Sequence, residues 1–163
     1  MFVLVAKEAM KSKYKPDVYV STESQKIIHI CKKYNLNYLK RPKKLAKDHV
    51  EKQDVIAHAT RKLQKKINPR IVISLQPNTP EFCSKDLDNA IYFFNTKVFP
   101  NRPIRELITI GKDNLQDGAF RIMTTKTVFQ KTLSTKVGIY FTNYQDIHYK
   151  KEFLNVKKKI EKN

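Results

Sequence analysis

The sequence predicts a single α/β domain in which a mostly parallel sheet carries helices on both faces. Helical and strand patterns alternate along the chain, and this alternation favours a largely parallel sheet. The clearest predicted strand, residues 70–75, consists mainly of β-branched apolar residues, which is typical of a strand buried on both faces. The length of 163 residues fits one domain, so we expect residues 1–163 to fold as one unit.

The first half of the chain predicts three helices and three strands. Apolar residues recur at helical spacing in three segments. Thr22 followed by Gln25 has the pattern of a capping box, which predicts a helix from there to about Tyr34. The other predicted helices cover residues 2–13 and 52–67, and the predicted strands cover residues 18–20, 37–40 and 70–75.

The second half predicts three more strands and three helices. Ser84 is expected to cap a helix that runs to about Phe94. The predicted strands cover residues 107–110, 119–123 and 137–141, and the remaining helices cover residues 125–133 and 150–162. Because ligands bind beyond the carboxyl ends of strands in such sheets, we expect the loops after Val20, Leu75 and Phe141 to carry the chemistry.

The start of the chain departs from the usual order of a doubly wound sheet. Such a sheet normally begins with a strand whose following loop holds phosphate, whereas this sequence opens on a predicted helix. Its glycines are Gly111, Gly118 and Gly138, so no Gly-rich phosphate loop lies near the start. We therefore expect the sheet to lack the first strand and the phosphate loop.

The composition indicates a globular, strongly basic protein. The formal net charge is +18, which attracts polyanions such as nucleotide phosphates. Most of the positive charge is Lys spread along the chain, so we do not expect a specific nucleic-acid reader. Cys31 and Cys83 have no metal-binding spacing and are expected to be reduced thiols. No apolar run could span a membrane and Glu8 interrupts any leader, so a cytoplasmic location is expected.

Six short motifs follow one another in a specific order. They are V-Y-V-S-T-E at 18–23, R-P-K-K-L-A-K-D at 41–48, D-V-I-A-H-A at 54–59, L-Q-P-N-T-P at 75–80, D-G-A-F-R-I at 117–122 and D-I-H at 146–148. In this order they resemble the motifs of the acylneuraminate cytidylyltransferases, which are CMP-sialic acid synthetase-like enzymes. The resemblance implies a nucleotide-diphospho-sugar transferase-like fold. It also implies transfer of CMP from CTP to a sialic-acid-like (nonulosonate) sugar, with release of pyrophosphate.

The chain departs from that family in three ways. It starts after the strand and loop that hold the CTP phosphates in the family. Asp146 matches one of the family's two Mg²⁺-binding aspartates, but His148 replaces the other, and Mg²⁺ prefers oxygen ligands. The segment 80–117 is shorter than the family's segment for sugar binding and dimer formation. We expect weakened Mg²⁺ binding and activity that is impaired or absent in this chain alone, and a homodimer remains possible.

The resemblance assigns roles to individual residues. Arg41 would contact the nucleotide, because a guanidinium makes bidentate bonds to phosphate or base. Gln76, Asn78 and Thr79 would bond nucleotide or sugar hydroxyls. Asp146 would hold Mg²⁺, with His148 the weaker metal candidate. Each also has a structural interpretation: a solvated Arg before a proline, turn-forming polar residues, and an ordinary loop aspartate.

Two classes of function remain open. In the first, the chain descends from the cytidylyltransferases and binds CTP and an acidic sugar. It is then either active with a segment supplied from upstream or from another chain, or catalytically dead. In the second, it is a non-catalytic domain that binds a nucleotide, a partner protein or nucleic acid. That alternative predicts no turnover, no metal requirement, and strong salt dependence if the ligand is nucleic acid.

Overall fold

A computed structural model describes residues 1–97, 104–132, 134–149, 151–154 and 156. The helices are α1 (Phe2–Met10), α2 (Gln25–Lys33), α3 (Lys52–Gln64), α4 (Ser84–Lys97) and α5 (Thr125–Val128), with a 3-10 turn η1 (Lys43–Ala46). The strands are β1 (Tyr19–Thr22), β2 (Asn37–Lys40), β3 (Ile71–Leu75), β4 (Glu106–Ile110), β5 (Gln116–Thr124) and β6 (Val137–Phe141). Of the described part of the chain, no helix combines the length and apolar character needed to cross a membrane.

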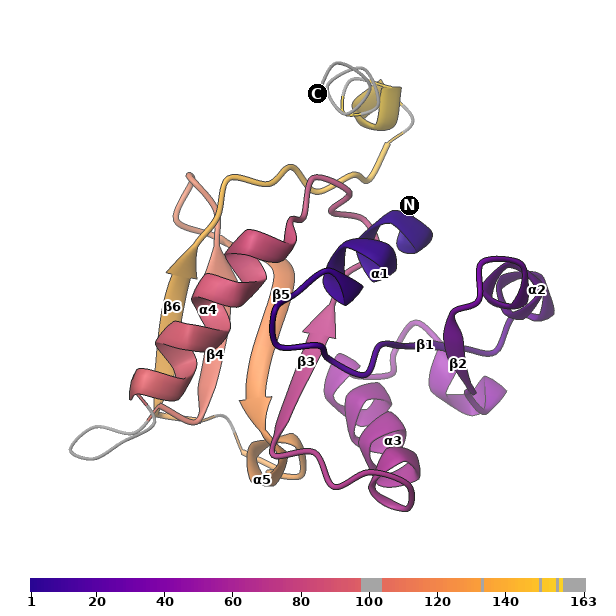
Figure 1. Cartoon of the computed structure of the whole chain (residues 1–163), viewed down its shortest axis with the longest axis horizontal. Coiled ribbons are helices and arrows are strands. Elements are labelled where there is room, and N and C mark those ends of the chain that lie inside the picture. The colour runs from indigo at the N-terminus through magenta and orange to yellow at the C-terminus, as the bar shows by residue number, and fades with distance from the viewer. Residues whose placement is uncertain (98–103, 133, 150, 155, 157–163) are drawn as a thin grey trace.

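The strands form two sheets. Four of them lie in the order β3-β5-β4-β6, and β1 pairs with β2 in a separate parallel pair beyond β3 (Figure 1). In the larger sheet β3, β4 and β6 run in one direction and β5 runs in the other. The predicted mostly parallel α/β fold is therefore confirmed, with β5 as the exception.

A tight hairpin explains the reversed direction of β5. The backbone N–H of Gly111 donates to the carbonyl oxygen of Leu115 at 2.9 Å, and Asn114 adopts a left-handed φ of 60°. Antiparallel neighbours can be joined by such a short turn, whereas parallel neighbours need a long crossover. Asn tolerates the left-handed conformation better than most residues, which is why it fits this position.

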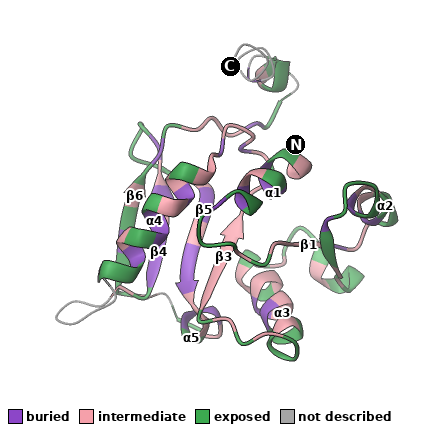
Figure 2. Cartoon of the chain, viewed as in Figure 1, coloured by how far each residue is buried: buried purple, intermediate pink, exposed green. Residues whose placement is uncertain are grey.

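Helices cover both faces of the larger sheet. On one face, α1 and α4 pack their apolar sides against strand residues that include Leu107, Phe120 and Ile122. On the other face, Met123 of β5 packs with Ala57 of α3 and Val128 of α5. Neighbouring strand residues point to opposite faces, so Ile122 and Met123 belong to different layers. Figure 2 shows the buried residues gathered along β4, β5 and the inner side of α4.

Two sequence-based predictions about helices were wrong in detail. The cap of α2 is Ser24, whose hydroxyl accepts from the N–H of Ile27 at 3.4 Å, because Thr22 is still part of β1. The helix predicted over 125–133 is the single turn α5, which ends at Val128, consistent with its β-branched residues. The helix predicted over 150–162 falls largely outside the described residues. Cys31 and Cys83 are free thiols, as expected.

Candidate functional site

The predicted site residues follow three strands. Arg41 comes directly after β2, Gln76 and Asn78 lie in the loop after β3, and Asp146 lies in the segment after β6. Two of these segments touch, because the backbone N–H of Ile147 donates to the carbonyl oxygen of Asn78 at 2.9 Å. Two of the three loops expected to carry the chemistry, those after Leu75 and Phe141, therefore touch, although their residues lie far apart in the sequence.

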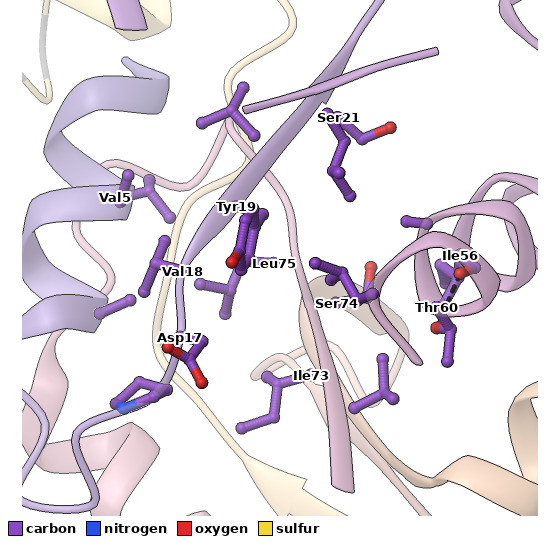
Figure 3. Close-up of a pocket in the computed structure, with 18 of the residues that line it drawn as sticks. Val5, Asp17, Val18, Tyr19, Ser21, Ile56, Thr60, Ile73, Ser74 and Leu75 are labelled. Atoms are coloured by element: carbon purple, nitrogen blue, oxygen red, sulfur yellow. Dashed lines mark hydrogen bonds between the residues drawn. The ribbon is translucent and has the colours of Figure 1, made fainter. Parts of the chain in front are cut away.

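A cavity of about 1000 Å³ opens between β1 and β3. Figure 3 shows residues of α1, β1, β3 and α3 around it, including Val5, Tyr19, Ile56 and Ser74. Arg41 and Asn78 line this cavity, together with Glu23 and Met1. Gln76, Thr79 and Asp146 are not among its lining residues. Of the candidate site residues, Arg41 and Asn78 therefore line the cavity, and the others lie outside its lining.

Arg41 is held at the cavity by an ion pair with Glu23. Its Nε donates to Glu23 Oε2 at 3.0 Å and its Nη2 to the same oxygen at 2.5 Å. These bonds lower the pKa of the Glu23 carboxyl. A guanidinium has five N–H donors, so donors remain for an anionic ligand, and the carboxylate fixes the position from which they act.

Gln76 lies against Gly118. Gly118 has a φ of +67°, and a Cβ at this position would overlap Gln76 Nε2 and lie 3.2 Å from its Cδ. Only glycine both adopts this backbone conformation easily and leaves this space open. The backbone of Gln76 also donates to the carbonyl oxygen of Ala119 at 3.1 Å. The turn at Gly118 therefore determines where the Gln76 side chain can lie.

Thr79 stabilises the loop after β3 and does not face the cavity. It is fully buried, and its hydroxyl donates to the carbonyl oxygen of Gln76 at 3.2 Å. Asn78 differs, because its side-chain Oδ1 is buried and has no hydrogen-bond partner within the described part of the chain. A buried polar atom without a partner is costly and needs an explanation. A ligand in the adjoining cavity would supply one.

Asp146 carries a second buried oxygen of this kind. Its Oδ1 has no hydrogen-bond partner among the described residues, and its Oδ2 lies 3.8 Å from Nε2 of the exposed His148. Burial raises the pKa of the Asp146 carboxyl, and the nearby charge of Asp117 raises it further. His148 and Lys52 oppose this effect. A carboxylate in this setting is stabilised by any cation that binds to its free oxygen.

Asp117 is a neighbour that sequence reasoning did not identify as functional. Its carboxylate accepts hydrogen bonds from the hydroxyls of Thr109 and Thr142 and from the backbone N–H of Ala119, the last at 3.0 Å. These bonds join β4, β5 and the end of β6. The available signal was an aspartate directly before a glycine, but its partners are too distant in sequence to be inferred from that pattern.

The side chains near Asp146 offer few ligands for the Mg²⁺ that the resemblance implies. No group of three or more His, Cys, Asp or Glu side chains that could hold a metal occurs in the described ranges. Mg²⁺ commonly binds through one or two carboxylates, with substrate phosphates supplying further ligands. The free Oδ1 of Asp146 fits that arrangement, whereas both oxygens of Asp117 already accept hydrogen bonds. Asp146 therefore fits as a single protein ligand.

The chain is similar to known proteins in structure and not in sequence. No protein-family model matches the chain, and no curated protein matches it. Solved structures do match. The structure of CMP:2-keto-3-deoxy-manno-octonic acid synthetase complexed with CTP superposes with a TM-score of 0.76 and 8% identity, over 99% of this chain and 87% of that one.

Two further structures share the architecture. A cytidylyltransferase from Leptospira borgpetersenii serovar Hardjo-bovis gives a TM-score of 0.61 with 15% identity, over 99% of this chain and 83% of that one. A structure from Desulfovibrio desulfuricans G20, assigned to the nucleotide-diphospho-sugar transferases, gives 0.61 with 11% identity, over 98% and 72%. At these identities the likeness establishes the fold alone. The chain has the nucleotide-diphospho-sugar transferase-like fold found in cytidylyltransferases.

Proposed function

We propose that this chain binds CTP and Mg²⁺ at the ends of β2 and β3, as part of a cytidylyltransferase that acts on an acidic sugar. The observation that carries the proposal is that Arg41 and Asn78 line one cavity, while the segment that holds Asp146 touches the loop of Asn78. Asn78 and Asp146 each have a buried side-chain oxygen without a partner among the described residues. The shared fold supports it. The CMP:2-keto-3-deoxy-manno-octonic acid synthetase is named for 2-keto-3-deoxy-manno-octonic acid, an acidic sugar, and acidic sugars are the substrate class we propose here.

The candidate residues would have two kinds of role, neutralisation of phosphate charge and hydrogen bonding to the substrates. Arg41 would neutralise phosphate charge, and the amides of Gln76 and Asn78 would bond the nucleotide or sugar hydroxyls. A sugar hydroxyl oxygen would form a bond to the α-phosphorus of CTP as the bond to the β-phosphate oxygen breaks. Pyrophosphate would leave, and the hydroxyl proton would pass to solvent. Mg²⁺ held by Asp146 would supply charge neutralisation at the phosphates.

Because of the motif resemblance, we propose that the acceptor is a sialic-acid-like sugar. We also propose that this chain alone has weak affinity for CTP. The glycines of residues 1–163 all lie at or beyond position 111, so the first hundred of these residues contain no Gly-rich loop that could supply backbone donors to the phosphates. Each lost charge-assisted bond removes about 1.5–3 kcal/mol. Turnover by this chain alone should therefore be slow or absent even where CTP binds.

One observation favours the alternative of a non-catalytic polyanion-binding domain. A basic surface at the C-terminal end of α3 contains Arg61 and Lys62 of the helix, near His58, and Lys65 and Lys66 just after it. Burial lowers the pKa of His58, and the neighbouring positive charges of Lys62 and Arg61 lower it further. Such a surface would attract any polyanion in a manner that weakens steeply with salt.

Calorimetric titration with CTP and Mg²⁺ separates these functions when it is applied to matched variants. Arg41→Ala should weaken CTP binding by about 10-fold or more, since it removes charge-assisted bonds. Arg70→Ala, the same exchange just before β3 and so at its opposite end, should leave the affinity within about twofold. A double variant, Arg41→Ala with Glu23→Gln, controls for the carboxylate freed by the first change. Equal losses for Arg41→Ala and Arg70→Ala would contradict the proposed site.

A further inference from the structure

The basic surface at the end of α3 is hollowed into a pocket of about 600 Å³ between α3 and β2 (Figure 1). We call it the basic pocket. Its lining consists of Leu39 of β2 and of residues in the last part of α3 and just after it, which are His58, Arg61, Lys62, Lys65 and Lys66. It is separate from the cavity beside β3, because its lining contains none of Arg41, Asn78 and Asp146.

The charges that line the basic pocket are all positive. They are those of Arg61, Lys62, Lys65 and Lys66, and no acidic side chain joins them from the part of the chain that the structure describes. Within the same part, none of the four forms a salt bridge. Arg61 and Lys65 are four residues apart, as are Lys62 and Lys66, and like charges at this spacing on a helix repel each other. An anion that binds among them would remove this repulsion.

Two of these cations are held in position by neighbouring elements. The guanidinium carbon of Arg61 lies 5.1 Å from the centre of the Phe129 ring, which directly follows α5. Lys62 Nζ donates to the carbonyl oxygen of Lys40 in β2 at 3.3 Å. A guanidinium has five N–H donors and an ammonium three, so both side chains keep donors for a ligand. A side chain that is already positioned loses less conformational freedom when a ligand binds.

The imidazole of His58 lies within this positive charge. Its Nδ1 is buried and has no hydrogen-bond partner among the described residues. Burial lowers the pKa of His58, and positive charges from three elements lower it further, namely Lys62 and Arg61 of α3, Arg41 after β2 and Lys44 of η1. An anion in the pocket would favour the charged imidazolium, so binding should raise the pKa of His58.

The lining indicates which kind of anion fits. Arginine and lysine both donate charge-assisted hydrogen bonds to phosphate oxygens. One phosphate group carries about −1.5 to −2 charges, so two linked phosphates balance the four cations of the lining better than one does. No Phe, Tyr or Trp side chain from the described ranges lines the pocket, so it offers no such ring on which a nucleic-acid base could stack.

We propose that the basic pocket is a second anion site, which binds a diphosphate group, either as free pyrophosphate or as part of a larger molecule. Arg61 and Lys62 would hold the phosphates from their fixed positions, and Lys65 and Lys66 would neutralise the remaining charge. The proposal does not depend on CTP binding in the cavity.

Proton NMR of the histidine rings tests this in the full chain without Mg²⁺. The protein is titrated with acid and base in sodium pyrophosphate and, for comparison, in sodium chloride of equal ionic strength, and His58→Gln assigns the His58 signal. Pyrophosphate should raise the pKa of His58. His148 lies 3.8 Å from Asp146 and so reports on the proposed CTP site. A His58 titration that pyrophosphate leaves unchanged, with or without a response of His148, would overturn the proposal.

Matched double variants separate the pocket from general attraction. Lys65→Gln with Lys66→Gln should weaken pyrophosphate binding, measured from the His58 signal, by about fivefold or more. Lys32 and Lys33 likewise lie at the C-terminal end of a helix, α2, where cations complement the helix dipole, but they lie outside the pocket. Lys32→Gln with Lys33→Gln should therefore keep the affinity within about twofold. Equal losses in the two double variants would contradict a defined site.

Two further probes identify the source of the phosphates. ADP presents a diphosphate within a larger molecule, and a response of His58 to ADP as well as to pyrophosphate would support a site that recognises the diphosphate itself. A single-stranded oligonucleotide carries only separate phosphates. A response of His58 to the oligonucleotide, but to neither pyrophosphate nor ADP, would overturn the proposal in favour of a nucleic-acid surface.

Discussion

The contact between Gly118 and Gln76 permits a quantitative test of how the site loop is positioned. In Gly118→Ala the new Cβ would overlap Gln76 Nε2, and the backbone would keep a φ of +67°. The left-handed conformation costs an alanine about 1–2 kcal/mol. Displacing the amide adds to this, so we expect a loss of about 2–3 kcal/mol in the free energy of unfolding.

Thermal unfolding followed by circular dichroism measures this loss. For a chain of this size, each kcal/mol lowers Tm by about 2–4 °C, so Gly118→Ala should lower it by about 4–12 °C. Gly111→Ala is the matched control, since its Cβ would meet Asp113 Oδ1 at 3.2 Å at the end of a flexible side chain. The control should lose about 1 kcal/mol or less.

A double variant separates the two costs. With Gln76→Ala already present, Gly118→Ala should cost only the backbone part, about 1–2 kcal/mol. The displaced amide should also weaken CTP binding in the single variant. Equal Tm values for Gly118→Ala and Gly111→Ala would contradict this prediction, because they would mean that neither the φ value nor the Gln76 contact constrains this turn.

Three further predictions concern the core and the charged groups. Phe94→Ala removes a fully buried side chain of α4 that packs in the core, and it should lower the free energy of unfolding by about 3–5 kcal/mol in urea titrations. Burial raises the pKa of Asp146, so its contribution to stability is greatest in acid and is lost as pH rises through the raised pKa. Asp146→Asn should therefore raise Tm at neutral pH while it weakens Mg²⁺-dependent CTP binding, and a fall in Tm would contradict this. Arg41 lowers the pKa of Glu23, so this pair stabilises the fold above the ordinary pKa of a glutamate and loses that effect as pH falls through the lowered value. In Arg41→Ala the acid limb of the Tm profile should flatten, with an effect of at most about 1 kcal/mol since the pair is partly exposed.

Sequence patterns predicted the positions of the strands well, because most strands are short runs of apolar residues in which β-branched and aromatic side chains are common. Residues 37–40 and 137–141 form strands with the predicted bounds, and 70–75 differs by one residue. The reversed β5 was not predicted, although two predicted strands follow each other there without a helix between them. That break in the alternation, together with the hairpin residues Gly111 and Asn114, was the signal for an antiparallel pair.

The site was only partly predictable. The general rule that ligands bind beyond the carboxyl ends of strands identified the loops that meet at Asn78 and Ile147. No sequence pattern could place Asp117, because its hydroxyl partners come from two other strand ends. Burial likewise could not be read from the pattern, so Thr79, which is fully enclosed, and Asn78, which lines the cavity, carried equal weight in the sequence.

A nucleotide site differs from general attraction of negative charge to a basic chain in that it selects among nucleotides of equal charge. The most direct measurement compares the affinities of CTP, UTP and ATP, three ligands of equal charge, by calorimetry with Mg²⁺ at two salt concentrations. If the site is as proposed, one CTP binds per chain, about tenfold or more tighter than the others, and this ratio is maintained at higher salt. Equal affinities that fall together with salt would contradict it, because they would show only the attraction expected of a chain with a net charge of +18.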